Sequence, residues 1–249
     1  MQTPRPLIAG NWKMHGLGLA IEEARVIAGA LDARPAAARV AICPPFTLIS
    51  RMAEAMVGSF VAVGAQDCRP EPAGAFTGGV SAEMLADAGA RLVIVGHSER
   101  RLEFGETDAL IAAKAAAAFR AGLEPIVCVG ENREQREAGQ ALDLVLAQVA
   151  GSLPGTAAGR DFAIAYEPIW AIGSGATPTC AEISEIHGAI RDLLGERFGA
   201  AGARAPILYG GSVKPANARD ILAAPDVNGA LIGGASLTAA EFLPILATV

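Results

Sequence analysis

The sequence predicts an α/β protein, a closed eight-stranded parallel (β/α)8 barrel that forms one domain over residues 1–249. Two observations lead to this prediction. Short β-branched or aliphatic runs recur from end to end, each followed by a polar or glycine-rich turn and a stretch compatible with a helix. No linker or low-complexity segment divides the series, and a single barrel of this kind typically takes about 250 residues. An open doubly wound sheet is the structural alternative.

Predicted strands and helices alternate along the whole chain. The strands are expected at Leu7–Asn11, Val40–Cys43, Phe60–Ala65, Leu92–His97, Pro125–Val129, Phe162–Glu167, Ile207–Tyr209 and Ala230–Gly233. The alanine-rich run 112–118 is strong helix sequence rather than a linker. The helices are expected at Leu17–Leu31, Thr47–Val57, Ser81–Ala88, Asp108–Ala121, Glu134–Ala150, Thr179–Phe198, Asn217–Ala223 and Ala239–Ala247.

Strand periodicity indicates which side chains face the barrel interior. Side chains alternate across a strand, so Ala163, Ala165 and Glu167 share one face. Small residues suit the crowded interior, and the alternate positions of this strand carry bulkier side chains, so we expect Glu167 to point inward at the mouth of the barrel. By the same alternation, Leu7, Ala9, Asn11 and Lys13 share one face of the first strand and its continuation. Val93, Val95 and His97 share one face of the fourth strand.

Composition and charge exclude several classes of function. Hydrophobic residues make up 52% of the chain, yet no apolar run approaches the roughly 18 residues of a membrane span, and no signal peptide is evident. We therefore expect a cytoplasmic protein without membrane contact. The net charge of −6 argues against a nucleic-acid partner. The four cysteines and three histidines lack metal-ligand spacing, so we expect reduced thiols and no metal site.

The segment after the sixth strand combines a carboxylate with a loop of unusual composition. Glu167 ends an apolar run and Pro168 stops the strand, after which a stiff Pro-Ile-Trp sequence leads into the flexible Gly173-Ser174-Gly175. We interpret Glu167 as a general base beside a lid. The alternative is a solvated carboxylate at the rim, followed by an ordinary glycine turn.

Lys13 follows the first strand, in Asn11-Trp12-Lys13. A lysine at the mouth of a barrel can attract an anionic substrate and neutralise charge that develops on oxygen. A solvated surface lysine is the alternative. The chain holds only two other lysines, Lys114 on the alanine-rich helix and Lys214 at a turn, and we expect Lys13 alone to lie near the mouth.

The fourth strand leads into His97-Ser98-Glu99-Arg100-Arg101. We expect His97 or Ser98 to begin a short helical turn, whose dipole disfavours a protonated imidazole. A neutral imidazole can donate to a carbonyl oxygen and exchange protons with oxygens. The alternatives are a structural histidine and, for Glu99 and the two arginines, an ion-pair cluster at the rim.

Double-glycine turns follow the seventh and eighth strands, in Gly210-Gly211-Ser212 and Gly233-Gly234. Turns at these two strands expose backbone N–H groups to a phosphate, aided by a helix N terminus and by the Ser212 hydroxyl. Each glycine pair alone is also consistent with a plain tight turn.

Five segments together resemble the signature segments of the triosephosphate isomerase family, in the family's order and over nearly the whole chain. They are Asn11-Trp12-Lys13, His97-Ser98-Glu99-Arg100, Tyr166-Glu167-Pro168-Ile169-Trp170-Ala171-Ile172-Gly173, Tyr209-Gly210-Gly211-Ser212-Val213 and Gly233-Gly234-Ala235-Ser236. The resemblance implies a TIM barrel that reversibly converts dihydroxyacetone phosphate to D-glyceraldehyde 3-phosphate through an enediolate. It places this reaction in glycolysis and gluconeogenesis, without a cofactor.

The same resemblance implies a role for each site residue. Glu167 would move the proton between adjacent carbons, and His97 would polarise the carbonyl group and shuttle protons between the oxygens. Asn11 and Lys13 would stabilise the developing oxyanion and the bound dianion, and Glu99 is counted with the catalytic residues. The phosphate would be held by Gly173, Ser212, Gly233 and Gly234, under a lid that follows Glu167.

A homodimer through the loop Gln66–Val80 is also implied, with Thr77 packed near the partner subunit's active site. Three positions depart from the family pattern. Asp67 replaces an asparagine, and Gly79 replaces a glutamate that could pair with Arg100, so we expect an altered interface rather than lost activity. Ala176 replaces a lysine at the far hinge of the lid.

Two other functions stay open from the residues alone. A phosphate-binding barrel of another chemistry, such as a Schiff-base aldolase, needs a lysine aimed into the barrel from a central strand. A non-catalytic barrel scaffold would be favoured by the loss of Glu167, His97 or Lys13, and all three are present.

Overall fold

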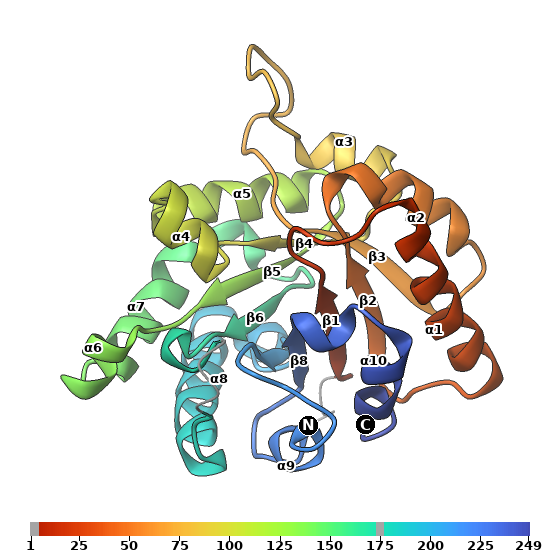
Figure 1. The fold of residues 1–249 in the computed structure, drawn as a ribbon. Helices are drawn as coiled ribbons and strands as arrows, with labels where there is room; N and C mark the ends of the chain where they lie inside the picture. The colour runs from red at the N-terminus through yellow and green to blue at the C-terminus, as the bar shows by residue number, and fades with distance from the viewer. Residues whose placement is uncertain (1–4, 173–176) are drawn as a thin grey trace.

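The computed structural model describes residues 5–172 and 177–249, which form a closed barrel of parallel strands surrounded by helices (Figure 1). Neighbouring strands pair in chain order, and β8 returns to pair with β1. The predicted barrel is confirmed, and the open doubly wound sheet was wrong because the first and last strands are joined. The strands are β1 (Leu7–Asn11), β2 (Arg39–Cys43), β3 (Val61–Ala65), β4 (Leu92–Val95), β5 (Glu124–Val129), β6 (Ala163–Tyr166), β7 (Ile207–Tyr209) and β8 (Gly229–Ile232).

An outer layer of helices covers the barrel (Figure 1). None of the helices in the described residues is long and apolar enough to cross a membrane. The α-helices are α1 (Ile21–Ala33), α2 (Ile49–Ala55), α3 (Ala82–Asp87), α4 (Ser98–Phe104), α5 (Asp108–Arg120), α6 (Arg133–Glu137), α7 (Ala141–Ser152), α8 (Cys180–Gly202), α9 (Ala218–Leu222) and α10 (Ala239–Leu246).

One predicted helix is divided in the structure. The single helix expected at Glu134–Ala150 is two helices, α6 and α7, because Gly139 has a left-handed φ of 71° directly after the end of α6. The start of α6 is fixed by a capping box in which the side chains of Asn132 and Gln135 satisfy each other's backbone N–H groups. The residues of α6 are all polar and none is buried, whereas α7 buries Ala141, Val145 and Val149, so only the second part of the predicted helix has an apolar face.

Two apolar layers hold the fold together. One lies between the strands and the helices, and the other consists of strand residues alone and fills the barrel. Each fully buried Leu or Ile contributes about 1.5–3 kcal/mol. Small side chains are frequent in the inner layer, as the narrow interior requires. The inner layer contains Leu7, Ala9, Ala41, Cys43, Leu92, Ile94, Ile126, Cys128, Ala163, Ala165, Leu208 and Leu231.

The predicted strand parity is confirmed for β1 and β6 and was wrong for β4. Ala163 and Ala165 lie inside, but in β4 the inner residues are Leu92 and Ile94, while Val93 and Val95 pack against the helices. His97 therefore does not share a face with the two valines. Gly96, with a left-handed φ of 68°, ends the strand and redirects the backbone, which brings His97 to the mouth.

The segment between β3 and α3 projects away from the barrel as a long loop (Figure 1). A bridge between Arg69 and Ser81 closes its base, and the Ser81 hydroxyl accepts a hydrogen bond from the Met84 N–H to begin α3. Near the outer part of the loop, Phe76 is 39% exposed and Thr77 is exposed. The loop makes apolar surface available that the described chain does not cover.

Candidate active site

A cavity of about 560 Å³ opens where the strands end and the following loops begin. It brings together residues from the two ends of the sequence and from its middle, as the barrel predicts. Glu99 does not line it, and Gly173, Gly175 and Ala176 lie outside the described residues. The predicted site residues on its wall are Asn11, Lys13, His97, Glu167, Ser212, Gly233 and Gly234.

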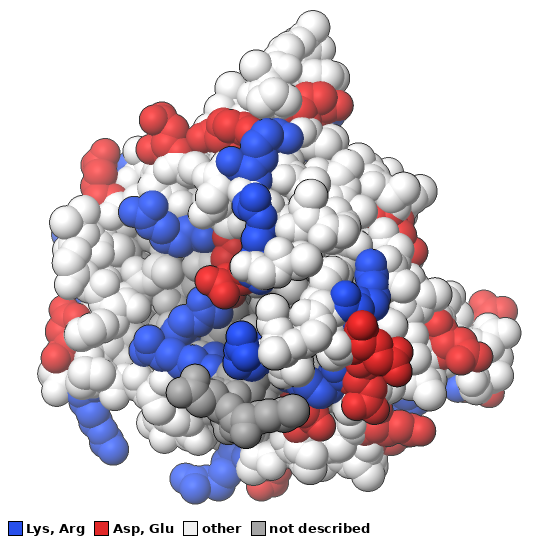
Figure 2. All heavy atoms as spheres, turned by 180° about the vertical axis from the view of Figure 1, so that it is seen from behind, with Lys and Arg blue, Asp and Glu red and all other residues white. Residues whose placement is uncertain are grey.

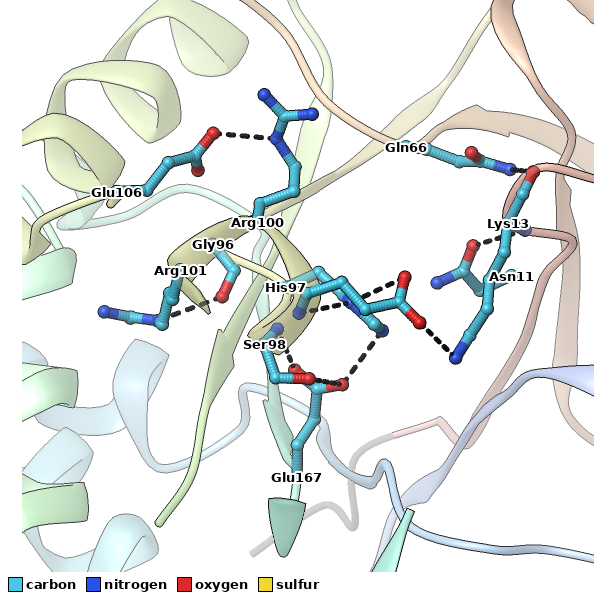
Figure 3. A network of polar contacts seen from close by, with 11 residues as sticks. Asn11, Lys13, Gln66, Gly96, His97, Ser98, Arg100, Arg101, Glu106 and Glu167 are labelled. Carbon is cyan, nitrogen blue, oxygen red and sulfur yellow. Dashed lines mark hydrogen bonds and ion pairs between the residues drawn. The ribbon is translucent and has the colours of Figure 1, made fainter. Parts of the chain in front are cut away.

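Glu167 lies directly after β6 with only 1% of its surface exposed. The backbone N–H of Ser98 donates to its Oε2 at 3.0 Å, the Ser98 hydroxyl donates to Oε1 at 3.3 Å, and His97 Nε2 is 2.9 Å from Oε1 (Figure 3). Burial raises the pKa of Glu167, but His97 and the Ser98 N–H outweigh burial, and the net pKa is lowered. The side chain is therefore a carboxylate at neutral pH, which is the form that a base requires.

Two glycines make room for Glu167. A Cβ atom on Gly210 would lie 2.8 Å from Glu167 Cγ, and one on Gly130 would lie 1.7 Å from the Glu167 carbonyl oxygen. Both distances are shorter than any ordinary contact between carbon or oxygen atoms. The close approach of β5, β6 and β7 at their ends thus depends on these two positions having no side chain.

His97 caps the N terminus of α4, which confirms the predicted helical turn. Its Nδ1 accepts a hydrogen bond from the Glu99 N–H at 3.3 Å, and this assigns the proton of a neutral ring to Nε2, facing Glu167. Burial lowers the pKa of His97, whereas the Glu167 carboxylate raises it, and the net shift is upward. The Glu99 carboxylate adds to this rise, and the Lys13 charge opposes it. When the ring is separated from Glu167, the largest upward influence on its pKa is lost, and burial, Lys13 and the helix N terminus favour the neutral form.

Lys13 has a left-handed φ of 53°, an uncommon conformation for a residue with a side chain. The Asn11 Oδ1 accepts from the Lys13 N–H at 3.0 Å, and Gln66 Nε2 donates to the Lys13 carbonyl at 2.9 Å. The Lys13 ammonium group is 2.7 Å from Glu99 Oε1 (Figure 3). These contacts hold the ammonium group at the cavity wall. Glu99 does not line the cavity itself and influences it only by binding Lys13.

The glycine turns after β7 and β8 line the same cavity as His97. A Cβ on Gly211 would lie 2.2 Å from the Tyr209 hydroxyl, so this turn accepts only glycine. Gly233 precedes a short 3-10 helix at Gly234–Ser236, whose free N–H groups start at the cavity. The Trp12 indole donates to the Ser236 carbonyl at 2.9 Å and ties this turn to the end of β1.

Comparison with known proteins identifies the family, since a family model described as triosephosphate isomerase matches residues 6–249. The chain belongs to the triosephosphate isomerase family. The triosephosphate isomerase of Caulobacter vibrioides is 61% identical over 244 residues, covering 98% of this chain and 96% of that protein. The one from Afipia carboxidovorans is 57% identical, with 97% and 96% covered. The crystal structure of triosephosphate isomerase from Bartonella henselae matches with a TM-score of 0.92 at 45% identity, covering 98% of both chains.

This protein is therefore an isomerase that acts on triose phosphates, and the aldolase and scaffold alternatives were wrong. The expectation that Lys13 alone would lie near the mouth was also wrong. Lys214 lines the cavity as well, at its exposed edge, because the turn after Ser212 folds over the barrel end. Among the described residues, no group of three or more His, Cys, Asp or Glu could hold a metal ion.

Sequence reasoning missed Glu131, which anchors the start of the predicted lid in this isomerase. Its fully buried side chain accepts hydrogen bonds from the Tyr166 hydroxyl at 3.1 Å and the Trp170 indole at 2.8 Å. Its carbonyl accepts from the Ile169 N–H at 3.0 Å. Burial raises the pKa of Glu131. The only feature of the sequence that pointed to Glu131 was its place directly after Gly130, where the buried fifth strand ends.

The two described departures from the family pattern are connected through Arg100. Asp67 Oδ2 is 2.9 Å from Arg100, Asp67 Oδ1 is 2.6 Å from Lys114, and Arg100 Nε is 2.7 Å from Glu106. Asp67 thus supplies Arg100 with a carboxylate that position 79 lacks. A Cβ on Gly79 would lie 2.5 Å from Arg69 Cδ, so in this loop conformation a glutamate there needs Arg69 to move.

Proposed function

We propose that Glu167 is the base and His97 the acid–base partner in the interconversion of dihydroxyacetone phosphate and D-glyceraldehyde 3-phosphate, the reaction of this family. The observation that carries this assignment is the buried contact between the two side chains on the wall of a cavity that also presents Lys13 and Asn11. A pair of titratable groups in hydrogen-bond contact at a concave site is the arrangement that proton transfer needs.

Glu167 removes a proton from the carbon next to the carbonyl group and returns it to the adjacent carbon. To reach the substrate, its carboxylate exchanges the two hydrogen bonds from Ser98 for contact with the carbon. The same movement releases His97 Nε2–H, which then donates to a substrate oxygen. The imidazole gives its proton to one oxygen of the enediolate and takes one from the other, so the ring is unchanged after a full turnover.

Lys13 and Asn11 stabilise the negative charge that develops on oxygen. A fixed ammonium group in a partly enclosed cavity stabilises an oxyanion without having to reorient during the reaction. Glu99 is a positioning residue in this proposal because its contact with the substrate runs through the Lys13 ammonium group at 2.7 Å. The rigid, left-handed backbone at Lys13 supports the same role.

The phosphate group of the substrate is held by the backbone N–H groups of the turns after β7 and β8. Support comes from the Gly211 turn, which admits no Cβ, and from the free N–H groups that start at Gly234. Ser212 lines the same part of the cavity and supplies a hydroxyl donor. Gly173 stays a predicted phosphate contact from the lid side.

Isomerisation in deuterium oxide tests the assignment of Glu167. The wild-type enzyme should convert D-glyceraldehyde 3-phosphate and incorporate deuterium at the transferred position, whereas Glu167→Gln should lower kcat about 10²- to 10⁴-fold. Glu54→Gln, an exchange on the outer helix α2, is the matched control and should retain full turnover. A Glu167→Gln enzyme with unchanged exchange would remove Glu167 from the mechanism.

A homodimer through the loop Gln66–Val80 is the second part of the proposal. The loop projects from the barrel (Figure 1) and itself carries Phe76, which is 39% exposed. Exposed apolar side chains also lie close to the loop, since Phe46, 44% exposed, lines a pocket with Thr77, and Met14, 94% exposed, follows the residue that Gln66 contacts. Sedimentation equilibrium should give a dimer for the wild type and for Phe60→Asp, and a monomer for Phe76→Asp. Phe60 is 64% exposed at the opposite end of the barrel, so it controls for the added charge.

The glycolytic reaction supports a cytoplasmic location, which cell fractionation followed by immunodetection would test. We also infer that the barrel is one cooperative domain over residues 1–249. Calorimetry of the dimer at several protein concentrations should then show a single unfolding transition, and two resolved transitions would contradict one domain.

A further inference from the structure

A second hollow, of about 360 Å³, lies at the end of the barrel opposite the active site. Its lining comes from residues that precede or begin strands, whereas the active-site cavity is built from residues that follow them. In the view from behind, Lys and Arg side chains gather around a depression near the middle of that face (Figure 2). The charged residues that line the hollow are Arg5, Arg39, Arg160, Arg204, Glu124 and Asp161.

One of the two carboxylates of the hollow is bound to an arginine. Glu124 binds Arg39 with two parallel hydrogen bonds of 2.6 and 2.7 Å. The Glu124 hydrogen bonds and charge raise the pKa of the Arg39 guanidinium against the effect of burial, and the charge of Asp161 adds a weaker upward influence. Arg39 is therefore neutralised within the protein and is not available for a ligand.

The side chains of the other three arginines of the hollow are exposed. Within residues 5–172 and 177–249, none of Arg5, Arg160 and Arg204 forms an ion pair with a carboxylate. Arg160 is held in place by a hydrogen bond of 2.9 Å to the Phe119 carbonyl and lies over the Phe119 ring at 5.6 Å. The Arg5 side chain donates to the Ala37 carbonyl at 3.4 Å, and the Arg204 side chain makes no hydrogen bond with any described residue, although its backbone N–H donates to the Ala201 carbonyl.

The concentration of positive charge is unusual for this protein. The chain as a whole carries a net charge of −6, yet four arginines and two carboxylates leave the hollow with a surplus of two positive charges. Solvated surface arginines normally spread apart, because like charges repel at short range. Here they converge on a concave surface, and concave walls strengthen the potential they create.

We propose that this hollow binds a small molecule with two or more anionic groups, either phosphates or carboxylates. Guanidinium groups match both in planar, two-pronged hydrogen bonds. The volume of about 360 Å³ is at the lower end of the range for small-molecule sites, which suits a compact metabolite rather than a nucleotide or a macromolecule. Arg160 supplies a pre-positioned charge, while Arg5 and Arg204 close on the second anionic group.

Occupancy of this site stabilises the folded enzyme without entering the active-site cavity. A ligand that binds only the folded state raises the unfolding temperature, and the stabilisation grows with the logarithm of one plus the ratio of ligand concentration to dissociation constant. Because the arginines are exposed, the affinity falls as ionic strength rises. The exposed Arg204 side chain forms no hydrogen bond or ion pair with a described residue, and a substitution keeps its backbone bond to Ala201, so replacement removes the charge and should leave the barrel intact.

Calorimetric titration with inorganic pyrophosphate tests the proposal, on dimeric enzyme saturated beforehand with a phosphate-bearing enediolate mimic that blocks the active site. A parallel titration with citrate distinguishes phosphate from carboxylate recognition. We expect one additional site per chain for at least one of the two probes. Arg204→Gln should weaken that binding about tenfold while isomerase turnover stays unchanged. Arg219→Gln, an exposed arginine on α9 outside the hollow, should not change the affinity.

Three results would overturn the proposal. One is no binding of either probe to the blocked enzyme at low salt. Another is equal affinity in the wild type, in Arg204→Gln and in a variant that combines Arg5→Gln with Arg204→Gln. The last is binding of a probe to the free enzyme that is lost once the mimic blocks the active site, because the probe would then have occupied only the active site. Circular dichroism of each variant confirms that the barrel is folded before affinities are compared.

Discussion

The two ends of the barrel differ in whether their charged side chains are buried and paired or exposed and unpaired. At the carboxyl ends of the strands, Glu167 and His97 are almost fully buried and bonded to each other. At the amino ends, Arg5 and Arg204 are exposed, and no described carboxylate pairs with them. Buried partners shift each other's pKa values and hold fixed positions, which proton transfer needs, whereas exposed like charges attract anions at a distance. The same strands thus support chemistry at one end and, in our proposal, ligand capture at the other.

The largest loss at the chemical end, apart from that of Glu167→Gln, is expected for Lys13→Met. Removal of one fixed oxyanion donor typically lowers kcat about 10²- to 10³-fold. Lys214→Met is the matched control, because Lys214 lines the exposed edge of the same cavity and forms no described ion pair. Steady-state kinetics should show less than about a tenfold loss for this control. Equal losses would mean that the cavity responds to total charge rather than to the position of Lys13.

A smaller loss is expected for Gly210→Ala. The added Cβ would meet Glu167 Cγ at 2.8 Å and the Tyr166 carbonyl at 3.1 Å, so the base has to shift. A displacement of about 1 Å at a reacting group can cost roughly 10²-fold, and we expect kcat to fall by about one to two orders of magnitude. Gly155→Ala, where a Cβ has open space, should be neutral. Full activity in Gly210→Ala would show that Glu167 tolerates displacement.

The pH profile tests the coupling of the buried pair. Glu167 works only as a carboxylate, so kcat/KM falls as pH drops through its folded pKa, which burial raises but His97 and Ser98 lower. His97→Gln removes the strongest lowering influence and leaves burial, so the Glu167 pKa rises and the acid limb of kcat/KM moves to higher pH. His15→Gln, an exposed ring, should leave the limb in place. An acid limb at the same pH in His97→Gln would contradict the coupling.

The smallest effect on activity is expected at the amino end. Glu124→Gln breaks the paired hydrogen bonds to Arg39 and should lower stability by about 1–3 kcal/mol, with a decrease in Tm of roughly 2–4 °C per kcal/mol. The turnover rate should not change. Thermal denaturation and a double-mutant cycle with Arg39→Gln measure the pair directly. A loss of turnover in Glu124→Gln would show that the two ends of the barrel are not independent.

The order of strands and helices was predictable because it depends on local periodicity and turn residues. The division at Gly139 was missed, because the polar residues of α6 are good helix formers and were joined to the amphipathic α7 across a single left-handed glycine. Glu167 and Lys13 could be selected from the sequence by their places after strands. Glu131 could not, because its importance comes from the Tyr166 and Trp170 donors on a neighbouring strand and loop.

By itself, the sequence determined the barrel and its family, and it selected most of the residues that line the active-site cavity. Those features depend on short segments whose composition dictates where a strand ends and a glycine turn begins. Only the tertiary structure decided how the charges pair. Gly96 turned His97 toward Glu167 against the strand parity, Asp67 became the partner of Arg100, and Glu124 neutralised Arg39. Such pairs join residues far apart in the chain, and their distances are set when the barrel closes.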